Sequence, residues 1–200
     1  MRHLLTIVIL LHGIGSAMAQ KTSPDARYVI EYFDALPNES NVKFKDAQSG
    51  KTLRHGFSSG YEERSFREVS WSPDSRFLAL VSRGTKTTSG IEILRFAGDS
   101  VTEVKIPDYL LNILGRKHLI SGGRHHWVSN VRWEDSHLTF RCWGQWGDGS
   151  GDPDIDPDNW YHFDVTLKVS RAVSPDRARL TAVSPVPQKD RGEQGGASNP

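Results

Sequence analysis

The sequence, 200 residues long, predicts an all-β domain built of antiparallel meanders, with one short helix. Three observations support this prediction. The tripeptide Ser-Pro-Asp recurs in front of strand-like segments, at residues 23–25 and 72–74. Alternating apolar and polar residues follow each copy, and turns that contain glycine interrupt the alternation. A repeated turn-and-strand unit cannot bury its apolar side alone, so the copies are expected to stack.

Residues 1–19 predict a secretory signal peptide rather than a part of the fold. Arg2 gives a positive start, an apolar run follows, and residues 17–19 fit the small-x-small cleavage pattern. Cleavage after Ala19 would make the protein secreted or periplasmic. The apolar run is too short for a permanent membrane span. The rest of the sequence contains no second long apolar run, so no membrane span is expected.

The first two repeat units are the clearest. The first runs from the turn at 23–25 to a hairpin at 42–53, and the second runs from the turn at 72–74 to a hairpin at 91–106. Proline fixes φ at the first central position of such a turn, and aspartate accepts hydrogen bonds from the backbone amides that follow. Each turn is therefore expected to lead directly into a strand.

The third unit is less regular. Residues 131–138 align with the segment that begins at Val69 if one residue is deleted. A long insertion at 144–159 then separates this hairpin from a strand at 160–167. A last Ser-Pro-Asp, at 174–176, counts as half a copy, because the residues after it predict a poor core strand.

The remaining segments complete the predicted organisation. Residues 107–114 predict the short helix, which Gly115 closes. From about Ser184 the chain has almost no apolar residues, so it cannot offset the entropy cost of ordering. The prediction is therefore a β-repeat domain at 20–183 and a disordered tail at 184–200.

The residues of the second unit carry a resemblance. The segment Trp-Ser-Pro-Asp-Ser-Arg-Phe-Leu-Ala at 71–79, together with residues 42–51, resembles the bacterial TolB-type and WD-repeat β-propeller families. In those families such units are four-stranded blades around an axis. Propellers usually have at least four blades, whereas this chain has about three units. The resemblance therefore implies blade-like meanders, as a partial propeller, a β-sandwich or one half of a two-chain ring, with Trp71 and Phe77 in the core.

Charge and cysteine content limit the classes of function. The chain has 25 basic and 24 acidic residues, so it lacks the broad positive surface that nucleic acid binding requires. Cys142 is the single cysteine, which excludes an intramolecular disulfide. It lies in an alternating strand pattern, and we expect a buried, inert thiol rather than a catalytic nucleophile.

The insertion of the third unit contains a possible metal site. Alternating aspartates can turn several carboxylates toward one point, and Ca²⁺ prefers six to eight oxygen ligands. The pattern of an EF-hand is absent, because Pro157 stands where that loop needs glycine. The alternatives are a Ca²⁺ site and a solvated hairpin loop. The candidate ligands are Asp148, Asp152, Asp154, Asp156 and Asp158.

Two other patterns give weak signals. His118, His125 and His126 could suggest zinc, but adjacent histidines on an extended strand point to opposite faces, so a polar loop leading into a strand is favoured. Residues 56–60 match the letters Gly-x-Ser-x-Gly without the strand and helix that a nucleophile elbow needs. No catalytic residue is therefore predicted.

The tryptophans lead to the functional hypothesis. Trp71 and Trp133 occupy matching repeat positions and are expected in the core, whereas Trp146 and Trp160 flank the acidic insertion and are the candidate ligand-binding residues. The favoured hypothesis is an exported, non-enzymatic binding module for a protein or carbohydrate ligand, without a cofactor other than Ca²⁺. The rivals are a metal-dependent hydrolase and a structural homodimer that closes a ring through its sheet edges.

Overall fold

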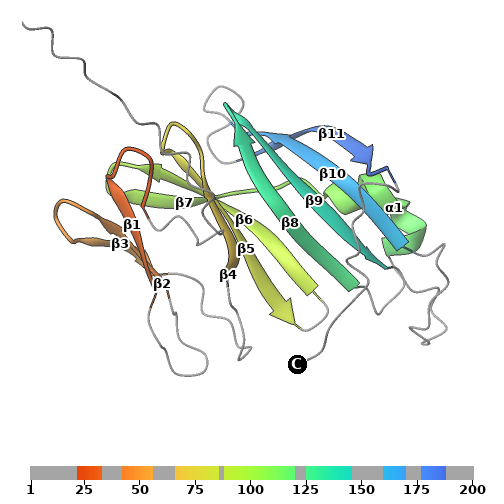
Figure 1. Cartoon of the computed structure of the whole chain (residues 1–200), viewed down its shortest axis with the longest axis horizontal. Helices are drawn as coiled ribbons and strands as arrows, with labels where there is room; N and C mark the ends of the chain where they lie inside the picture. Colours follow the sequence, from red (N-terminus) through yellow and green to blue (C-terminus); the bar gives the residue numbers. More distant parts are fainter. Residues whose placement is uncertain are drawn as a thin grey trace, which may run out of the picture.

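The computed structural model describes residues 22–32, 42–55, 66–85, 88–119, 125–145, 160–169 and 177–187. These residues form eleven strands and one helix, so the predicted all-β fold with a short helix is confirmed (Figure 1). The predicted signal peptide at 1–19 lies outside the described residues. In the described part of the chain, no helix has the length and apolarity to cross a membrane.

The strands form three successive antiparallel meanders, which Figure 1 shows side by side in chain order. The first meander has three strands, and an isolated bridge between Thr22 and Val29 precedes it. One parallel bridge, between Thr88 and His126, joins the second and third meanders into a formally eight-stranded sheet. The strands are β1 (Tyr28–Tyr32), β2 (Val42–Asp46) and β3 (Thr52–His55); β4 (Phe66–Trp71), β5 (Phe77–Thr85), β6 (Thr88–Ala97) and β7 (Ser100–Val104); and β8 (His125–Glu134), β9 (His137–Gln145), β10 (Trp160–Lys168) and β11 (Arg179–Pro185).

The two Ser-Pro-Asp turns have the same hydrogen bonds. In the first turn Ser23 Oγ donates to Asp25 Oδ1 at 2.7 Å and accepts from the Tyr28 N–H at 2.9 Å. In the second turn Ser72 makes both bonds at the same lengths, to the residues 49 positions further along the chain (23 to 72). The first two units are therefore structural repeats as well as sequence repeats.

The third turn differs from the alignment that the sequence suggests. Trp133 lies opposite Leu138 as Trp71 lies opposite Leu78 in the second unit. The connection between the paired residues is therefore two residues shorter than in the second unit, whereas the sequence alignment deletes only one residue. Asp135 closes this tighter turn with a φ of 49°, a left-handed conformation that aspartate tolerates better than most residues.

The meanders stack through two apolar clusters, one on each face of the second meander. Burying a large side chain such as Leu80 or Leu94 contributes about 2 kcal/mol, and both are fully buried here. Trp71 and Phe77, each 5% exposed, lie in these clusters as expected. The cluster against the first meander contains Tyr28, Ile30, Val42, Phe44, Trp71, Leu78, Leu80, Leu94 and Phe96. The cluster against the third includes Phe77, Ala79, Val81, Ile91, Ile93, Val128, Leu138, Phe140, Cys142, Val165 and Leu167.

Helix α1 (Tyr109–Leu119) follows β7 and covers the second of these clusters. Asp108 Oδ1 accepts the Leu111 N–H at 3.1 Å and caps the first turn. Gly115 leaves the helical conformation, with φ 68° and ψ 167°, as the prediction of a glycine stop requires. A further helical turn nevertheless continues to Leu119, beyond the predicted end.

The C-terminal boundary of the domain was predicted too early. The predicted end at residue 183 falls inside β11, which pairs with β10 along its length. Val186 is 1% exposed, and its N–H donates to the carbonyl oxygen of His162 at 3.0 Å. Apolar content alone missed this strand, because β11 is an edge strand held mainly by backbone pairing. Residues 188–200 lie outside the described residues.

Candidate functional site

A β-bulge in β8 determines which side chains lie on each face of the third meander. β8 and β9 pair Arg132 with Thr139 and next pair Ser129 with Arg141, so β8 has one extra residue in this interval. Asn130, inside the bulge, has a φ of 54°. An extra residue reverses the alternation of faces along a strand.

The reversal decides where the aromatic residues of β8 lie. Without the bulge, His126 and Val128 would share a face with Arg132. With the bulge, Val128 points into the core and is 4% exposed, whereas Trp127 lies on the opposite face. We call this second face, which turns away from the second meander, the outer face.

The side chain of Glu68, from β4 of the second meander, holds the bulge in place. Its carboxylate oxygens accept the N–H groups of Asn130 at 2.9 Å and Val131 at 2.8 Å. These two N–H groups are left without strand partners by the bulge. Hydrogen bonds to a charged acceptor are stronger than those between neutral groups, so Glu68 favours this register over an unbulged one.

Five aromatic rings gather on the outer face, in what we call the aromatic cluster. Trp143 of β9 lies between its cross-strand partners Trp127 and His162. The centroids of the Trp127 and Trp143 rings are 4.3 Å apart, with planes 20° apart. Trp160 lies 6.3 Å from Trp127 and 6.4 Å from Trp143, again with nearly parallel rings. All five residues are half-buried. The cluster is His125, Trp127, Trp143, Trp160 and His162.

Polar pairs continue the outer face along the same strands. Arg141 Nε donates to Asp164 Oδ1 at 2.9 Å and Arg141 Nη2 donates to Oδ2 at 3.2 Å, a bidentate ion pair. In the next row the hydroxyls of Thr139 and Thr166 lie 3.2 Å apart. Both side chains of the ion pair keep contact with solvent, at 20% and 32% exposure. A ligand on the outer face would therefore meet aromatic rings beside donors and acceptors.

The same positions are apolar in the other two meanders. The cross-strand pair Thr139–Thr166 occupies the place that Ala79–Ile93 occupies in the second meander. Equivalent backbone hydrogen bonds define this correspondence. The carbonyl oxygen of Arg76 accepts the Phe96 N–H in the second meander, and the carbonyl oxygen of Ser136 accepts the Val169 N–H in the third. The corresponding pairs are Ile30–Phe44, Ala79–Ile93 and Thr139–Thr166, and in the next row Val81–Ile91 and Arg141–Asp164.

This replacement distinguishes the outer face from a stacking face. The first and second meanders use these positions to pack against the next meander, with Ile30 at 1% and Ala79 at 0% exposure. In the third meander, threonines and an ion pair stand there instead. A polar terminal face is typical of the last unit of a stack, and the added aromatic cluster is more than solubility requires.

The inner face of the third meander has a hydrogen-bond chain through His126. Its Nε2 lies 2.9 Å from the hydroxyl of Tyr109, and its Nδ1 lies 2.8 Å from the hydroxyl of Tyr161. Tyr161 in turn donates to the carbonyl oxygen of His125 at 3.4 Å. The chain joins α1 to the sheet and gives this half-buried histidine a structural role.

Cys142 lies on the same inner face and is fully buried, as expected. Burial, helped by the negative charge of Asp164, raises the pKa of the Cys142 thiol to about 12. The thiol is therefore neutral at physiological pH, which argues against a nucleophilic role.

The sequence-based site predictions have different outcomes. Trp160 lies in β10 and belongs to the aromatic cluster. Trp146 and the predicted Ca²⁺ ligands lie outside the described residues, so that part of the site stays a prediction. In the described ranges, no three histidine, cysteine or acidic residues come together as metal ligands. The predicted Ca²⁺ ligands that lie outside the described residues are Asp148, Asp152, Asp154, Asp156 and Asp158.

The opposite faces predicted for the two adjacent histidines are confirmed, but both histidines lie in β8 and not in a loop that leads into it. His125 and His126 lie on opposite faces of β8, since His125 contacts Trp127 with ring centroids 5.3 Å apart and His126 bonds on the inner face. The analysis of the sequence missed Trp127, Trp143 and His162 as a group. A regular pairing of β8 with β9, counted outward from the turn that joins them, would place Trp127 opposite Gly144. The extra residue of the bulge places Trp127 opposite Trp143 instead.

Comparisons with known proteins add little to this geometry. No family model matches the chain, and no curated protein matches it. Among solved structures, the chain is similar to hydrazine synthase of Kuenenia stuttgartiensis, with a TM-score of 0.44 and 12% sequence identity. The similarity covers 82% of this chain and 41% of the hydrazine synthase chain, so this chain spans less than half the length of the hydrazine synthase chain. A likeness at this TM-score carries no argument about fold or function.

Proposed function

We propose that this protein is an exported, non-enzymatic binding module that holds a saccharide on the outer face of its third meander. The observation that carries the proposal is the replacement of apolar packing positions by aromatic and polar side chains on that face. The pyranose ring of a sugar has a C–H face that packs on an indole, and its hydroxyls need donors and acceptors nearby. The cluster around Trp143, followed by Arg141 and Asp164, offers both.

Two unpartnered atoms on this face support a binding role. Trp143 Nε1 and Ser129 Oγ are both buried, and neither has a hydrogen-bond partner among the described residues. Leaving such a group unpaired costs about 1–3 kcal/mol. Uncompensated polar groups are uncommon in native structures, and each one needs an explanation.

The arrangement favours binding over hydrolysis. Glycoside hydrolysis ordinarily uses two carboxyl groups on either side of the bond to be cleaved. In the described rows next to the aromatic cluster, the carboxylate is Asp164, and Arg141 engages both of its oxygens. A carboxylate held in this way is better suited to orienting a hydroxyl than to exchanging a proton.

The three meanders are proposed to be successive blades of the propeller type. The repeated turns, the 49-residue shift between Ser23 and Ser72, and the equivalent cross-strand pairs support this assignment. The outer face would then be the place where a further blade packs in a closed ring. Its polar composition favours a ligand there over an apolar blade from a second copy.

Titration calorimetry with hexasaccharides of β-1,4-linked glucose and of β-1,4-linked N-acetylglucosamine tests the proposal. Replacing Trp160 by Ala is expected to weaken binding at least about tenfold, since one stacking ring contributes about 1.4 kcal/mol. The matched control is Trp133→Phe, because Trp133 lies on the inner side, stacked on Phe77 with its Nε1 donating to the carbonyl oxygen of Ser70. Equal affinity for both variants, or no binding by the wild type, would reject the saccharide.

A further inference from the structure

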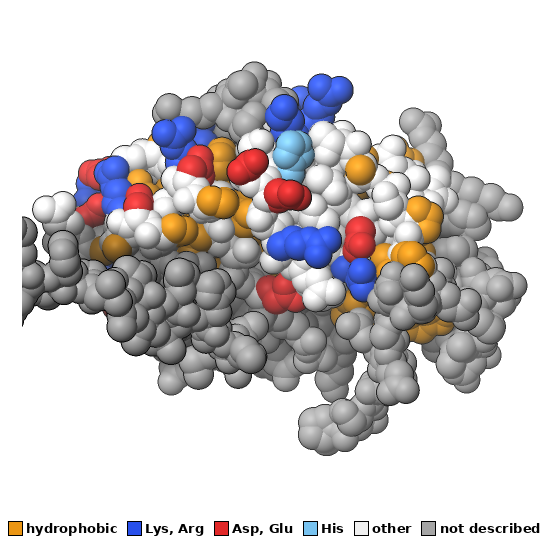
Figure 2. All heavy atoms as spheres, turned by 45° about the horizontal axis from the view of Figure 1, so that its top comes forward, with side chains coloured by type: hydrophobic (Ala, Val, Ile, Leu, Met, Phe, Trp, Pro, Cys, Tyr) orange, Lys and Arg blue, Asp and Glu red, His pale blue; other side chains and the backbone are white. Residues whose placement is uncertain are grey.

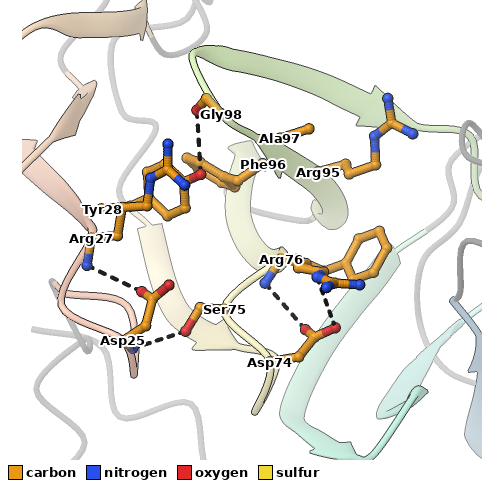
Figure 3. A pocket seen from close by; sticks show the side chains of 11 residues that line it. Asp25, Arg27, Tyr28, Asp74, Ser75, Arg76, Arg95, Phe96, Ala97 and Gly98 are labelled. Atoms are coloured by element: carbon orange, nitrogen blue, oxygen red, sulfur yellow. Dashed lines mark hydrogen bonds and ion pairs between the residues drawn. The ribbon is translucent and has the colours of Figure 1, made fainter.

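A concave site lies apart from the outer face, where the first and second meanders meet (Figure 3). It encloses about 310 Å³ between the two Ser-Pro-Asp turns and the hairpin that joins β6 to β7. The charged residues in its wall are Asp25, Arg27, Asp74, Arg76 and Arg95. The site is independent of the proposed function, because none of these residues belongs to the third meander.

Cross-links between the two units fix the walls of this cavity. The N–H of Asp25 donates to Ser75 Oγ at 2.9 Å, across 50 positions of the chain. The hydroxyl of Tyr28 donates to the carbonyl oxygen of Gly98 at 3.3 Å. Figure 3 shows these bonds on opposite sides of the site. The cavity is therefore preformed and does not depend on a movement of either turn.

The carboxylates of the wall are already engaged by their own turns. Asp25 Oδ1 accepts from Ser23 Oγ at 2.7 Å and from the Arg27 N–H at 3.1 Å. Asp74 Oδ1 accepts the equivalent bonds at the same lengths, from the hydroxyl of Ser72 and the N–H of Arg76. Burial raises the pKa of Asp25, but the bonds from Ser23, Arg27 and Ser75 outweigh it, so this pKa lies below its usual value.

The guanidinium groups of the wall make no short hydrogen bonds within the described residues, although that of Arg27 lies over the ring of Tyr28, 5.2 Å from its centroid. Arg27 lies 3.7 Å from Asp46 Oδ2 and Arg76 lies 3.8 Å from Asp74 Oδ2, both beyond hydrogen-bond length. Arg95 Nε is buried without a partner among the described residues. Each guanidinium carries five N–H donors in a planar fork that suits oxyanions. With three arginines and two aspartates, the wall has a net charge of +1 (3 − 2).

We propose that this cavity binds a small oxyanion, a phosphate or a carboxylate, through Arg27 and Arg76, with Arg95 adding positive charge. The repeat places Arg27 and Arg76 at equivalent positions of their turns, so both approach the same cavity. A bound oxyanion would accept the N–H donors that the weak ion pairs leave unused. It would also reduce the repulsion between the arginines.

Thermal unfolding of the full chain measures this binding. Sodium phosphate and sodium acetate are titrated separately, each against sodium chloride at matched ionic strength. At a tenfold excess over Kd, the preferred oxyanion is expected to raise Tm by about 3 °C. The phosphate and acetate arms identify which oxyanion the site prefers. A rise in Tm that sodium chloride reproduces overturns the proposal.

Single substitutions test whether the oxyanion that raises Tm binds in this cavity. Arg76→Met and Arg27→Met are each expected to lower the affinity for the preferred oxyanion at least tenfold. Arg179→Met is the matched control, because Arg179 is an exposed arginine on β11, outside the cavity. The proposal fails if Arg179→Met weakens binding as much as Arg76→Met, or if neither cavity variant weakens it. Saccharide binding should be unchanged in all three variants, so the two proposals succeed or fail separately.

Discussion

At the scale of single residues, Glu68 links the candidate site to the second meander. It lies in the second meander, yet its carboxylate fixes the bulge that turns Trp127 to the outer face of the third. The site therefore depends on a contact between meanders as well as on its own strands. This explains how a residue outside the aromatic cluster can control it.

Replacing Glu68 by Ala is expected to destabilise the protein by about 1–3 kcal/mol, because two N–H groups of the bulge lose a charged hydrogen-bond acceptor. The same variant should weaken the exciton signal that the stacked Trp127 and Trp143 rings give in far-ultraviolet circular dichroism. Glu103→Ala is the matched control, since Glu103 is an exposed glutamate on β7. An unchanged exciton signal in Glu68→Ala would show that the bulge forms without its cap.

Cys142 provides a second test at this scale. Its thiol is fully buried and its pKa is raised to about 12, so thiolate is scarce below that pH. A disulfide reagent at pH 8 is expected to leave the native protein unmodified and to label it once in urea. Fast labelling of the native protein would place Cys142 at an accessible surface, in conflict with the packing of β9.

At the scale of elements, the Ser-Pro-Asp turns define the repeat. Ser23→Ala and Ser72→Ala are each expected to destabilise the protein by about 1–2 kcal/mol, since each variant removes two hydrogen bonds of the same kind. The effects should add in the double variant, because the two serines share no partner. Urea unfolding measures both quantities. A neutral result for one serine alone would mean that the two turns are not equivalent.

The sequence was sufficient to predict elements whose signals are local. The turn at 72–74, the hairpin at 91–106 and the helix stop at Gly115 each follow from residues that lie close together in the chain. The bulge at Asn130 has no such signal, because its N–H is satisfied by Glu68, 62 positions away. β11 was underestimated for a similar reason, since its partner is the backbone of β10.

The candidate site was predictable only in part. Trp160 stands at the start of a recognisable strand, so its place near the insertion could be inferred. The pairing of Trp127 with Trp143 could not, because one extra residue in β8 changes which residue faces Trp143. The cavity between the turns depends on the packing of two repeats, and sequence spacing alone does not give that distance.

At the scale of the whole molecule, the described stack has polar faces at both ends. The outward face of the first meander carries Glu31, Lys43 and Lys45, and Lys45 Nζ lies 2.6 Å from Glu31 Oε2. The outer face of the third carries the Arg141–Asp164 pair beside the aromatic cluster. Figure 2 shows basic and acidic side chains interspersed over one side of the molecule. Both ends of the described stack therefore carry ion pairs on the faces that have no neighbouring meander among the described residues.

The central claim is that a saccharide binds on the outer face, and the indole N–H signals of the ¹⁵N-labelled protein test it most directly. Titration with the hexasaccharide that binds in calorimetry is expected to shift the signals of Trp127, Trp143 and Trp160. Those of Trp71 and Trp133, which lie between the meanders, are expected to stay in place. Shifts confined to Trp71 and Trp133, or no shift at any indole, would contradict the account.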